Sequence, residues 1–363
     1  MTTAPTKSTA IYSNEVGKVI LHDLPAPQPE DDEILIRVLY SGANLSDVRT
    51  LELYGFKNYV LGNEFCGEVL ETPSLAATSF KAGDIVAGLV TAGKDRPSRF
   101  GTHQEHIAIP PSWASKVPDN VPPHAAAALT IVVQTANDAL YNRLRLPLPP
   151  SLATPEERAN AQEPEGTLVI WGGATGVGMA AIQLARASRI PSIVVVASAK
   201  RHDWLKSLGA TQCFDYHDED VADQVKSALK GTKGTIWGFD ALGSFADPNS
   251  QDLLASVIPE HNNVSLVTVL LTPQKGFQPT MAGRHFDLEF DMPDGTKITL
   301  SKDVVAAERM WRALGWVVEH YGTEYIPTPV RVFNGTGKEA IDELYRMKEM
   351  SHFGRTVLKH PLK

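Results

Sequence analysis

The sequence predicts an α/β protein in which a doubly wound parallel sheet is inserted into a smaller β-barrel domain. Three observations predict this fold. The length of 363 residues exceeds one ordinary hydrophobic core and favours two domains. Along the chain, short strands separated by turn residues give way to strands that alternate with helices. Near the middle of the chain, a glycine-rich turn joins an apolar strand to a helix.

Composition excludes several classes of protein. With 43% hydrophobic and 21% charged residues, the chain is expected to be globular. A net charge of −8 leaves no extended basic surface, so nucleic acid is not an expected partner. Cys66 and Cys213 form no CxxC motif and indicate a reducing compartment, although one disulfide between them stays open. Because no signal-peptide core or membrane-spanning apolar stretch is present, we expect a cytoplasmic protein with no membrane partner.

The first part of the chain predicts the small β domain. Strands are expected over residues 33–40, 64–70 and 85–90. From residue 125 an alanine-rich helical pattern continues to residue 146, which we interpret as the crossover between domains. Residues 147–165 are rich in proline, alanine and charge without a period, and they predict a long surface loop.

The parallel sheet is expected after that loop. Strand and helix patterns alternate over residues 167–171, 179–189, 193–197, 202–208, 213–215, 221–229, 235–239 and 264–270. Because parallel strands need crossover connections, this alternation predicts a sheet covered by helices on both faces. A helix over 304–321 and a strand over 356–359 no longer fit the alternation, and we expect them to return to the first domain.

The glycine-rich turn Gly172-Gly-Ala-Thr-Gly176-Val-Gly178 carries the prediction of a cofactor. Such glycines let the chain turn tightly and let backbone N–H groups approach a pyrophosphate at the positive end of a helix. We therefore predict a Rossmann dinucleotide-binding domain in which Gly178 allows the helix to pack closely on the strand. The alternative is a loop that needs glycine only for its backbone conformation. The predicted cofactor contacts in this turn are Ala174, Thr175, Gly176, Val177 and Gly178.

The end of the second strand of that domain predicts which dinucleotide is bound. It reads Ser198-Ala-Lys200-Arg201, without the carboxylate with which an NAD-specific domain grips the ribose hydroxyls. Ser198, Lys200 and Arg201 are able to bind a 2′-phosphate, so NADPH is the expected cofactor. The alternative is that the two cations merely solvate a helix start. Tyr216 is expected near the adenosine, or else as a buried structural tyrosine.

Further landmarks occur in a fixed order along the chain. They are Gly42-Ala-Asn44-Leu-Ser46-Asp47, Leu61-Gly62-Asn63-Glu64-Phe-Cys-Gly67, Gly83-Asp84-Ile-Val86, the helical run 125–135, Leu208-Gly209-Ala210 and Phe239-Asp240-Ala-Leu-Gly243. With the glycine turn, this order resembles the medium-chain dehydrogenase/reductase superfamily over nearly the whole chain. The resemblance implies a GroES-like substrate-binding domain in residues 1–134, a Rossmann NADPH-binding domain in 135–284 and a return to the substrate-binding domain in 285–363.

Two departures from that family bear on metal binding. Asn44 and Asn63 stand where zinc-dependent members, by resemblance, carry a cysteine and a histidine ligand. Residues 91–100, where a structural zinc loop would fall, contain no cysteine. Cys66 neighbours one ligand position and is interpreted as a small buried hydrophobe. The sequence therefore predicts a zinc-independent enzyme with no metal site.

Within the zinc-free branch, two segments resemble fungal enoyl reductases of the lovastatin type, which act in trans on polyketide synthases. They are Leu146-Pro-Leu-Pro149 before the long loop and the final run Gly354-Arg355-Thr-Val. The resemblance implies an oxidoreductase of secondary metabolism that reduces an α,β-unsaturated thioester, with a polyketide synthase as partner and a monomer favoured over a dimer. This chain retains Gly176 and Gly178. The polyketide synthases on which such reductases act can have the corresponding glycines of the nucleotide loop replaced by bulkier residues.

The resemblance also implies site residues outside the glycine turn. The catalytic candidates are Arg49 and Thr135, which are expected to position cofactor or substrate, while water is the expected proton source. The implied cofactor contacts are Ser46, Asp47, Val48, Arg49, Val269, Leu270, His352 and Phe353. The alternatives are a capped helix turn at 46–49, a helix hydroxyl bonded to its own backbone at 135 and an ordinary histidine at 352. No Ser-His-Asp constellation is expected.

Two other functions stay open. An NADPH-dependent quinone or enone reductase for free small molecules would use the same site, and its turnover of quinones would equal or exceed its turnover of a carrier-bound enoyl thioester. An accessory protein that binds NADPH without chemistry would still support a synthase after its glycine turn was disrupted.

Overall fold

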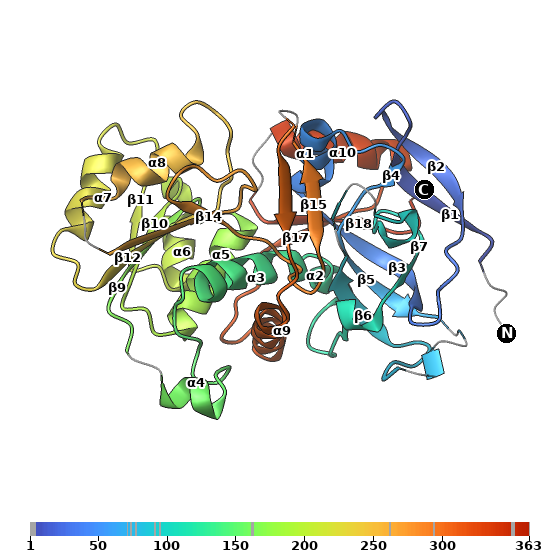
Figure 1. Ribbon diagram of the computed structural model, residues 1–363, viewed down its shortest axis with the longest axis horizontal. Coiled ribbons are helices and arrows are strands. Elements are labelled where there is room, and N and C mark those ends of the chain that lie inside the picture. The colour runs from blue at the N-terminus through green and yellow to red at the C-terminus, as the bar shows by residue number, and fades with distance from the viewer. Residues whose placement is uncertain are drawn as a thin grey trace. The chain divides into compact units, whose positions relative to one another are not determined.

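The computed structural model describes residues 5–70, 72, 75–76, 78–90, 92–93, 96–160, 163–260, 263–292, 295–349 and 353–362. The chain forms two compact units (Figure 1). Unit 1 comprises Met1–Ile131, Gly283–Asp303 and Pro329–Lys363, and unit 2 comprises Val132–Ala282 and Val304–Thr328. The chain therefore enters and leaves unit 2 twice.

Unit 1 is built around a seven-stranded sheet. The strand order is β17-β18-β3-β5-β6-β8, with β7 paired to β3. The strands are β3 (Ile34–Ala43), β5 (Glu64–Val69), β6 (Ile85–Leu89), β7 (His106–Ile109), β8 (Ala114–Lys116), β17 (Val330–Phe333) and β18 (Arg355–Lys359). Alternate residues of a strand point to one face, and Ile36, Val38 and Phe65 are accordingly buried in one core cluster. The strands expected over 33–40, 64–70 and 85–90 correspond to β3, β5 and β6.

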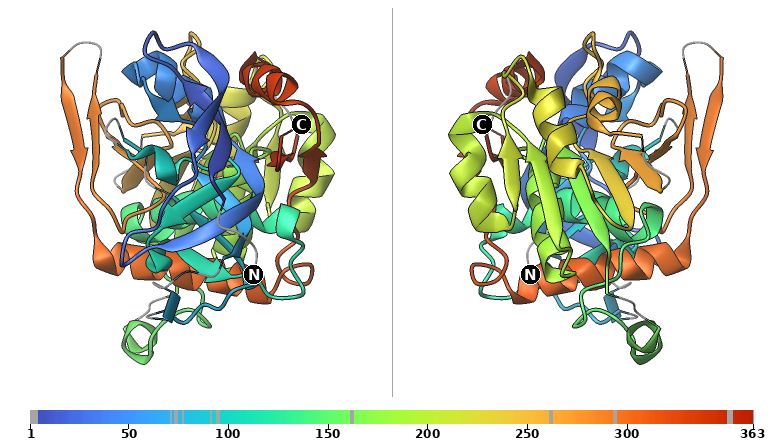
Figure 2. Two further views of the ribbon diagram at one scale, coloured as in Figure 1. Left: turned by 90° about the vertical axis from the view of Figure 1, so that its right-hand side faces the viewer. Right: turned by 90° about the vertical axis from the view of Figure 1, so that its left-hand side faces the viewer.

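Smaller elements complete unit 1. In a three-stranded sheet, β1 (Lys7–Ser13) pairs with β2 (Val19–Pro25) and β4 (Tyr59–Val60). A separate two-stranded ribbon, β15 (Leu288–Asp291) with β16 (Lys297–Leu300), is seen in Figure 2. The helical elements are α1 (Leu45–Tyr54), α2 (Pro123–Ala126), α10 (Gly337–Glu349) and the 3-10 turns η2 (Ser98–Phe100) and η3 (Pro111–Trp113).

Unit 2 contains a six-stranded parallel sheet in the order β11-β10-β9-β12-β13-β14. The strands are β9 (Gly166–Trp171), β10 (Ser192–Val196), β11 (Gln212–Phe214), β12 (Thr235–Asp240), β13 (Val264–Thr268) and β14 (Phe277–Pro279). Counted along the chain, this order is 3-2-1-4-5-6, the strand order of a Rossmann dinucleotide-binding fold. The predicted doubly wound sheet is confirmed.

Helices connect the parallel strands of unit 2. They are α5 (Gly176–Ala187), η5 (Ala199–Arg201), α6 (His202–Leu208), α7 (Val221–Leu229) and α8 (Ser250–Val257). Helix α5 packs beside α6, and α7 packs beside α8. All of β9 is buried, as expected for a central strand covered on both faces. No helix among the described residues is long and apolar enough to cross a membrane.

One segment lies in a different unit from the one that the sequence indicated. Helix α9 (Val304–Glu319) belongs to unit 2, although residues 285–363 were expected to return together to the first domain. The reason is its packing on the π-helical turn η4 (Asp138–Arg143). A guanidinium nitrogen of Arg309 donates to the side-chain oxygen of Asn142 at 2.7 Å, and its carbonyl accepts a hydrogen bond from Asn137 at 3.3 Å.

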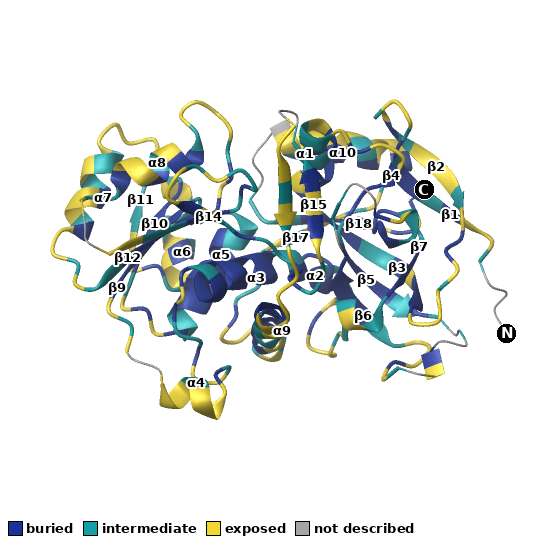
Figure 3. Ribbon diagram, viewed as in Figure 1, coloured by how far each residue is buried: buried dark blue, intermediate teal, exposed yellow. Residues whose placement is uncertain are grey.

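The long loop and the alanine-rich run also differ in detail from the expectation. The loop contains a short helix, α4 (Pro155–Ala159), because Thr154 and Glu157 form a capping box with hydrogen bonds of 2.8 and 3.1 Å. The alanine-rich run is divided into α2, α3 (Thr130–Asn137) and η4. Figure 3 shows α3 largely buried and α4 largely exposed.

Candidate functional site

The glycine turn of unit 2 forms a helix N-terminus at the carboxyl end of β9. Thr175 is the N-cap of α5, and its Oγ1 accepts a hydrogen bond from the N–H of Gly178 at 3.0 Å. The N–H groups of Gly172 and Gly173 both donate to the carbonyl of Val196, at 3.0 and 3.2 Å. The turn is thereby fastened to the neighbouring strand β10. A helix start fixed in this way attracts a phosphate group.

The turn leaves no room for larger residues at three glycines. Gly172 has a φ of +85°, which favours glycine. A Cβ on Gly178 would lie 2.5 Å from the carbonyl oxygen of Gly172, and a Cβ on Gly173 would collide with Val195. At Gly178 the helix therefore packs closely on the turn that follows β9. This backbone fits the pyrophosphate of a dinucleotide.

A buried carboxylate holds the next loop at the same end of the sheet. Asp240 ends β12, and its Oδ1 accepts hydrogen bonds from two backbone N–H groups of the following loop, at 3.1 and 3.2 Å. Its Oδ2 accepts the hydroxyls of Ser250 and Thr268, at 2.9 and 2.7 Å. The predicted contacts Val269 and Leu270 follow Thr268 directly. They therefore lie at the carboxyl end of the sheet, where the glycine turn also lies.

The residues predicted to bind the adenosine end follow two neighbouring strands. Ser198 and Arg201 are half-buried and Lys200 is exposed, all after β10. Tyr216, after β11, is 51% exposed, which excludes the alternative of a buried structural tyrosine. Its ring lies 4.1 Å from that of His217, measured between centroids. Because β10 and β11 are parallel neighbours, these residues share one edge of unit 2.

Thr135 lies in the buried helix α3. It is 8% exposed, and its carbonyl accepts a hydrogen bond from the Thr280 hydroxyl at 3.1 Å. The same hydroxyl lies 3.1 Å from Oδ2 of Asp138, the first residue of the π-helical turn. Such turns are frequent at functional sites. The segment is firmly held, and the role of the Thr135 hydroxyl stays a prediction.

In unit 1, the predicted residues 46–49 form the first turn of α1, with Asn44 as N-cap. The carboxylate of Asp47 accepts a hydrogen bond from the N–H of Asn44 at 2.7 Å, as in a capping box. Ser46 is exposed, Val48 is buried, and Arg49 is half-buried. Burial lowers the pKa of Arg49 from its ordinary value. The capped helix turn considered as an alternative is therefore present.

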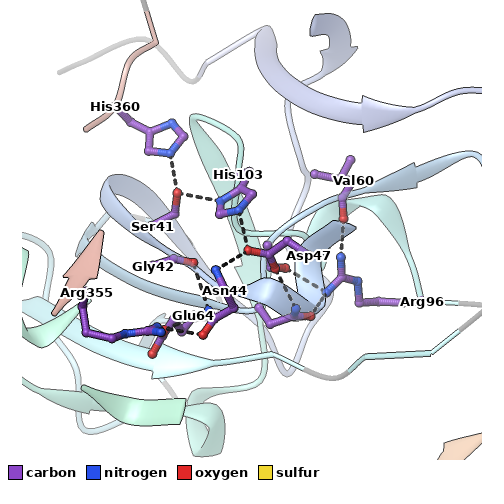
Figure 4. Close-up of polar contacts among 12 residues, drawn as sticks. Ser41, Gly42, Asn44, Asp47, Val60, Glu64, Arg96, His103, Arg355 and His360 are labelled. Carbon is purple, nitrogen blue, oxygen red and sulfur yellow. Dashed lines mark hydrogen bonds and ion pairs between the residues drawn. The ribbon is translucent and has the colours of Figure 1, made fainter. Parts of the chain in front are cut away.

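Asp47 is also the centre of a buried polar network (Figure 4). Its Oδ2 lies 3.1 Å from Nε2 of His103, and its Oδ1 accepts a hydrogen bond from Asn63 at 3.1 Å. Nδ1 of His103 lies 2.8 Å from the Ser41 hydroxyl, which lies 2.8 Å from Nε2 of His360. The pKa of His360 is lowered to about 3, mainly by burial and to a smaller extent by the nearby His103. This imidazole is therefore neutral near pH 7.

Ser41, His103 and Asp47 are therefore joined in a hydrogen-bonded chain, although no catalytic Ser-His-Asp constellation was expected. Ser41, His103 and Asp47 are buried, so the serine is not presented to solvent as a nucleophile. We interpret the three side chains as a structural chain that joins β3, α1 and the end of the chain at His360. No pattern in the sequence links Ser41 with His103, because the two residues are 62 positions apart.

A second buried carboxylate, that of Glu64, adjoins this network. It pairs with the guanidinium of Arg355 at 2.5 Å and accepts hydrogen bonds from Asn44 and from the N–H of Ile131, both at 3.0 Å. Burial raises the pKa of Glu64, and Arg355 opposes that rise. Of the two predicted contacts near Arg355, His352 lies outside the described residues and Phe353 is half-buried.

The positions at which the resemblance implies zinc ligands are occupied by hydrogen-bonded amides. The Asn44 amide donates to Glu64. The Asn63 amide donates to Asp47, and its oxygen accepts a hydrogen bond from buried Arg96 at 2.8 Å. A guanidinium here repels a metal cation. Among the described residues, no group of three or more His, Cys, Asp or Glu side chains is arranged to hold a metal ion.

Two family models match the chain. The alcohol dehydrogenase GroES-like domain matches residues 30–119, which lie in unit 1. The zinc-binding dehydrogenase domain matches residues 176–259, which lie in unit 2.

Curated fungal proteins are similar over much or most of the chain. The trans-enoyl reductase himH of Aspergillus japonicus is 32% identical over 250 residues, covering 67% of this chain and 67% of the relative. The dehydrogenase orf1 of Aspergillus niger is 27% identical over 348 residues, covering 93% of this chain and 94% of the relative.

Solved structures share the fold. An alcohol dehydrogenase superfamily protein from Novosphingobium aromaticivorans matches with a TM-score of 0.70 and 20% identity, covering 97% of this chain and 99% of that chain. A mycobacterial protein solved in complex with NADPH matches with a TM-score of 0.67 and 22% identity, covering 97% of this chain and 99% of that chain.

Proposed function

Since this chain belongs to the medium-chain dehydrogenase/reductase superfamily, and is therefore an oxidoreductase with a nicotinamide cofactor, we propose that it uses NADPH to reduce α,β-unsaturated thioesters. The observation that carries the proposal is the glycine turn of unit 2. There a 12-residue helix starts against a backbone with no room for side chains at three glycines. The pyrophosphate of the cofactor is bound at this turn.

The choice of NADPH over NADH is supported by the residues after β10. Ser198 offers a hydroxyl, and Lys200 and Arg201 offer positive charge, beside exposed Tyr216. A 2′-phosphate bound here gains charge-assisted hydrogen bonds. NADH lacks the 2′-phosphate with which these two cations would pair.

The choice of an enoyl thioester is supported by the names of fungal relatives. Besides himH, the relatives mpsG of Macrophomina phaseolina and caaB of Aspergillus niger are named trans-enoyl reductases, and each is 28% identical to this chain. We propose the same substrate class here, delivered by a polyketide synthase to a monomeric reductase.

When bound, NADPH would supply a hydride to the β-carbon of the substrate. In our proposal, the residues of this chain hold the reactants and stabilise charge. The glycine turn fixes the pyrophosphate, and the residues after β10 fix the adenosine. Arg49 and Thr135 position the nicotinamide or the substrate carbonyl, which accumulates negative charge, and water supplies the proton at the α-carbon.

The test is NADPH oxidation with crotonyl and longer α-methyl enoyl thioesters, with NADH and a quinone as comparators. Gly176→Asp places a negative charge at the predicted pyrophosphate position and should abolish both binding and turnover. Gly315→Asp, the same change on the exposed side of α9, is the matched control and should retain them. Quinone turnover equal to or above thioester turnover would replace the proposal with a quinone reductase. NADPH binding without turnover of any acceptor would indicate an accessory role.

A further inference from the structure

A carboxylate that the sequence did not connect with the cofactor lies against the loop after β10. Asp215 follows β11, and its Oδ2 accepts a hydrogen bond from the N–H of Ala199 at 2.9 Å. Ala199 stands between Ser198 and Lys200, two of the residues assigned to the 2′-phosphate. An acid so close to a phosphate site would ordinarily repel NADPH and favour NADH.

We propose that Asp215 has the opposite effect and is a positioning residue that shapes the loop 198–201 to receive a 2′-phosphate. This inference rests on the proposed use of NADPH and adds the residue that builds its specificity. Hydrogen bonds hold the loop in place, and the carboxylate of Asp215 is already bound to donors of the protein.

The restraints hold the loop on both sides of Ser198. Before it, the N–H of Ala197 donates to the carbonyl of Phe214 at 3.0 Å. After it, the N–H of Ala199 donates to Asp215. The Ser198 carbonyl accepts the N–H of Arg201 at 2.9 Å. Ser198 is therefore held in one extended conformation before any ligand binds, with φ of −60° and ψ of 140°. A loop ordered in advance loses less entropy on binding.

The charge of Asp215 is directed to donors of the protein itself. Its Oδ1 accepts the backbone N–H of His217 at 3.0 Å and lies 2.7 Å from Nδ1 of the same residue. The hydrogen bonds from His217 and Ala199 lower the pKa of Asp215 to about 2, so the group is ionised near neutral pH. An ionised carboxylate accepts only, so Nδ1 of His217 carries a proton and donates it. The carboxylate of Asp215 thus accepts hydrogen bonds both from the loop after β10, at Ala199, and from its own segment, at His217.

Asp215→Asn distinguishes a positioning role from a purely repelling charge, because the two roles predict opposite changes in the affinity for NADPH. The side-chain amide introduces N–H donors opposite the N–H groups of Ala199 and His217, so the hydrogen bond that holds the loop at Ala199 is weakened or lost. If Asp215 positions the loop, the dissociation constant for NADPH rises about 10-fold and that for NADH changes less than about 2-fold. If Asp215 acts only as a repelling charge, NADPH binds more tightly to the variant. Tighter or unchanged NADPH binding would overturn the inference.

Asp218→Asn is the matched control. It removes the same charge from the same exposed segment, where the Asp218 carboxylate accepts a hydrogen bond from Gln224 at 3.3 Å. Both dissociation constants should stay within about 2-fold of the parent protein. Binding is measured by fluorescence titration, so turnover is not needed. A parent protein that binds both dinucleotides equally would contradict the proposed use of NADPH, whereas an NADPH preference that Asp215→Asn leaves unchanged would contradict this inference alone.

Hydrogen exchange of the parent protein gives a second measurement if the variant fails to fold. The amide of Ala199 should exchange slowly without ligand, because its hydrogen bond to Asp215 is already formed. The segment 197–201 should gain further protection from adenosine 2′,5′-bisphosphate and less from 5′-AMP. Rapid exchange of this segment in the free protein, or equal protection by the two nucleotides, would overturn the inference.

Discussion

Oδ2 of Asp47 lies 3.1 Å from Nε2 of His103, and both side chains are fully buried. The carboxylate also accepts hydrogen bonds from Asn44 and Asn63. A residue assigned from the sequence to the cofactor is thus enclosed by donors of unit 1. We therefore expect a substitution of Asp47 to reduce the stability of unit 1.

Asp47→Asn should lower the free energy of unfolding by about 2–4 kcal/mol, because the new amide opposes buried donors. Urea unfolding followed by circular dichroism measures the change. Asp31→Asn, at an exposed position, is the control and should stay within about 0.5 kcal/mol. A loss of cofactor affinity in Asp47→Asn without any loss of stability would instead support direct contact with the cofactor.

His360 should make stability depend on pH. Its folded pKa of about 3 lies below the ordinary histidine value of 6.5, so its stabilising contribution is present above pH 6.5 and is lost as the pH falls towards 3. In His360→Gln this contribution is absent, so the difference in unfolding free energy between the parent and the variant should shrink over that range. His22→Gln, at an exposed imidazole, should leave the pH profile of the parent unchanged. A constant difference between pH 7 and pH 4 would refute the assignment.

Gly178→Ala tests the packing of the glycine turn. The added Cβ would meet the Gly172 carbonyl oxygen at 2.5 Å, so the helix must shift. We expect a loss of about 1–3 kcal/mol in stability and a marked loss of cofactor affinity. Gly315→Ala is the matched control, because its Cβ would meet no atom within 4 Å. Within helix α9 that change should be neutral or stabilise by up to about 1 kcal/mol.

Lys200→Gln tests the predicted 2′-phosphate contact. Removal of the cation should weaken NADPH binding about 10-fold, or about 1.4 kcal/mol, and leave NADH binding unchanged. Lys206→Gln removes another exposed cation, which lies in α6, and should change neither affinity. Equal weakening of both dinucleotides by Lys200→Gln would mean that Lys200 supports the loop rather than the phosphate.

The fold of unit 2 was predictable because its signals are local. Apolar strands such as β9 and the glycines that follow it are adjacent in sequence, and the alternation of strands and helices sets the parallel connections. The N-terminal signal of α4 was equally local, in Thr154-Pro155-Glu-Glu157, but was missed because the composition of the segment suggested a loop.

The buried polar networks of unit 1 depend on contacts between residues that are far apart in the sequence. Ser41 meets His360 across 319 residues, and Asp47 meets His103 across 56. A single serine or histidine gives no sign of its partner, because the partner is chosen by the strands and turns that bring two backbones together. The parallel sheet and the glycine turn, by contrast, follow from patterns between residues that are close in the sequence. The enclosure of Asp47 within unit 1 and the hydrogen bond from Ala199 to Asp215 depend on the fold, because each carboxylate accepts hydrogen bonds from donors that other segments of the chain bring to it.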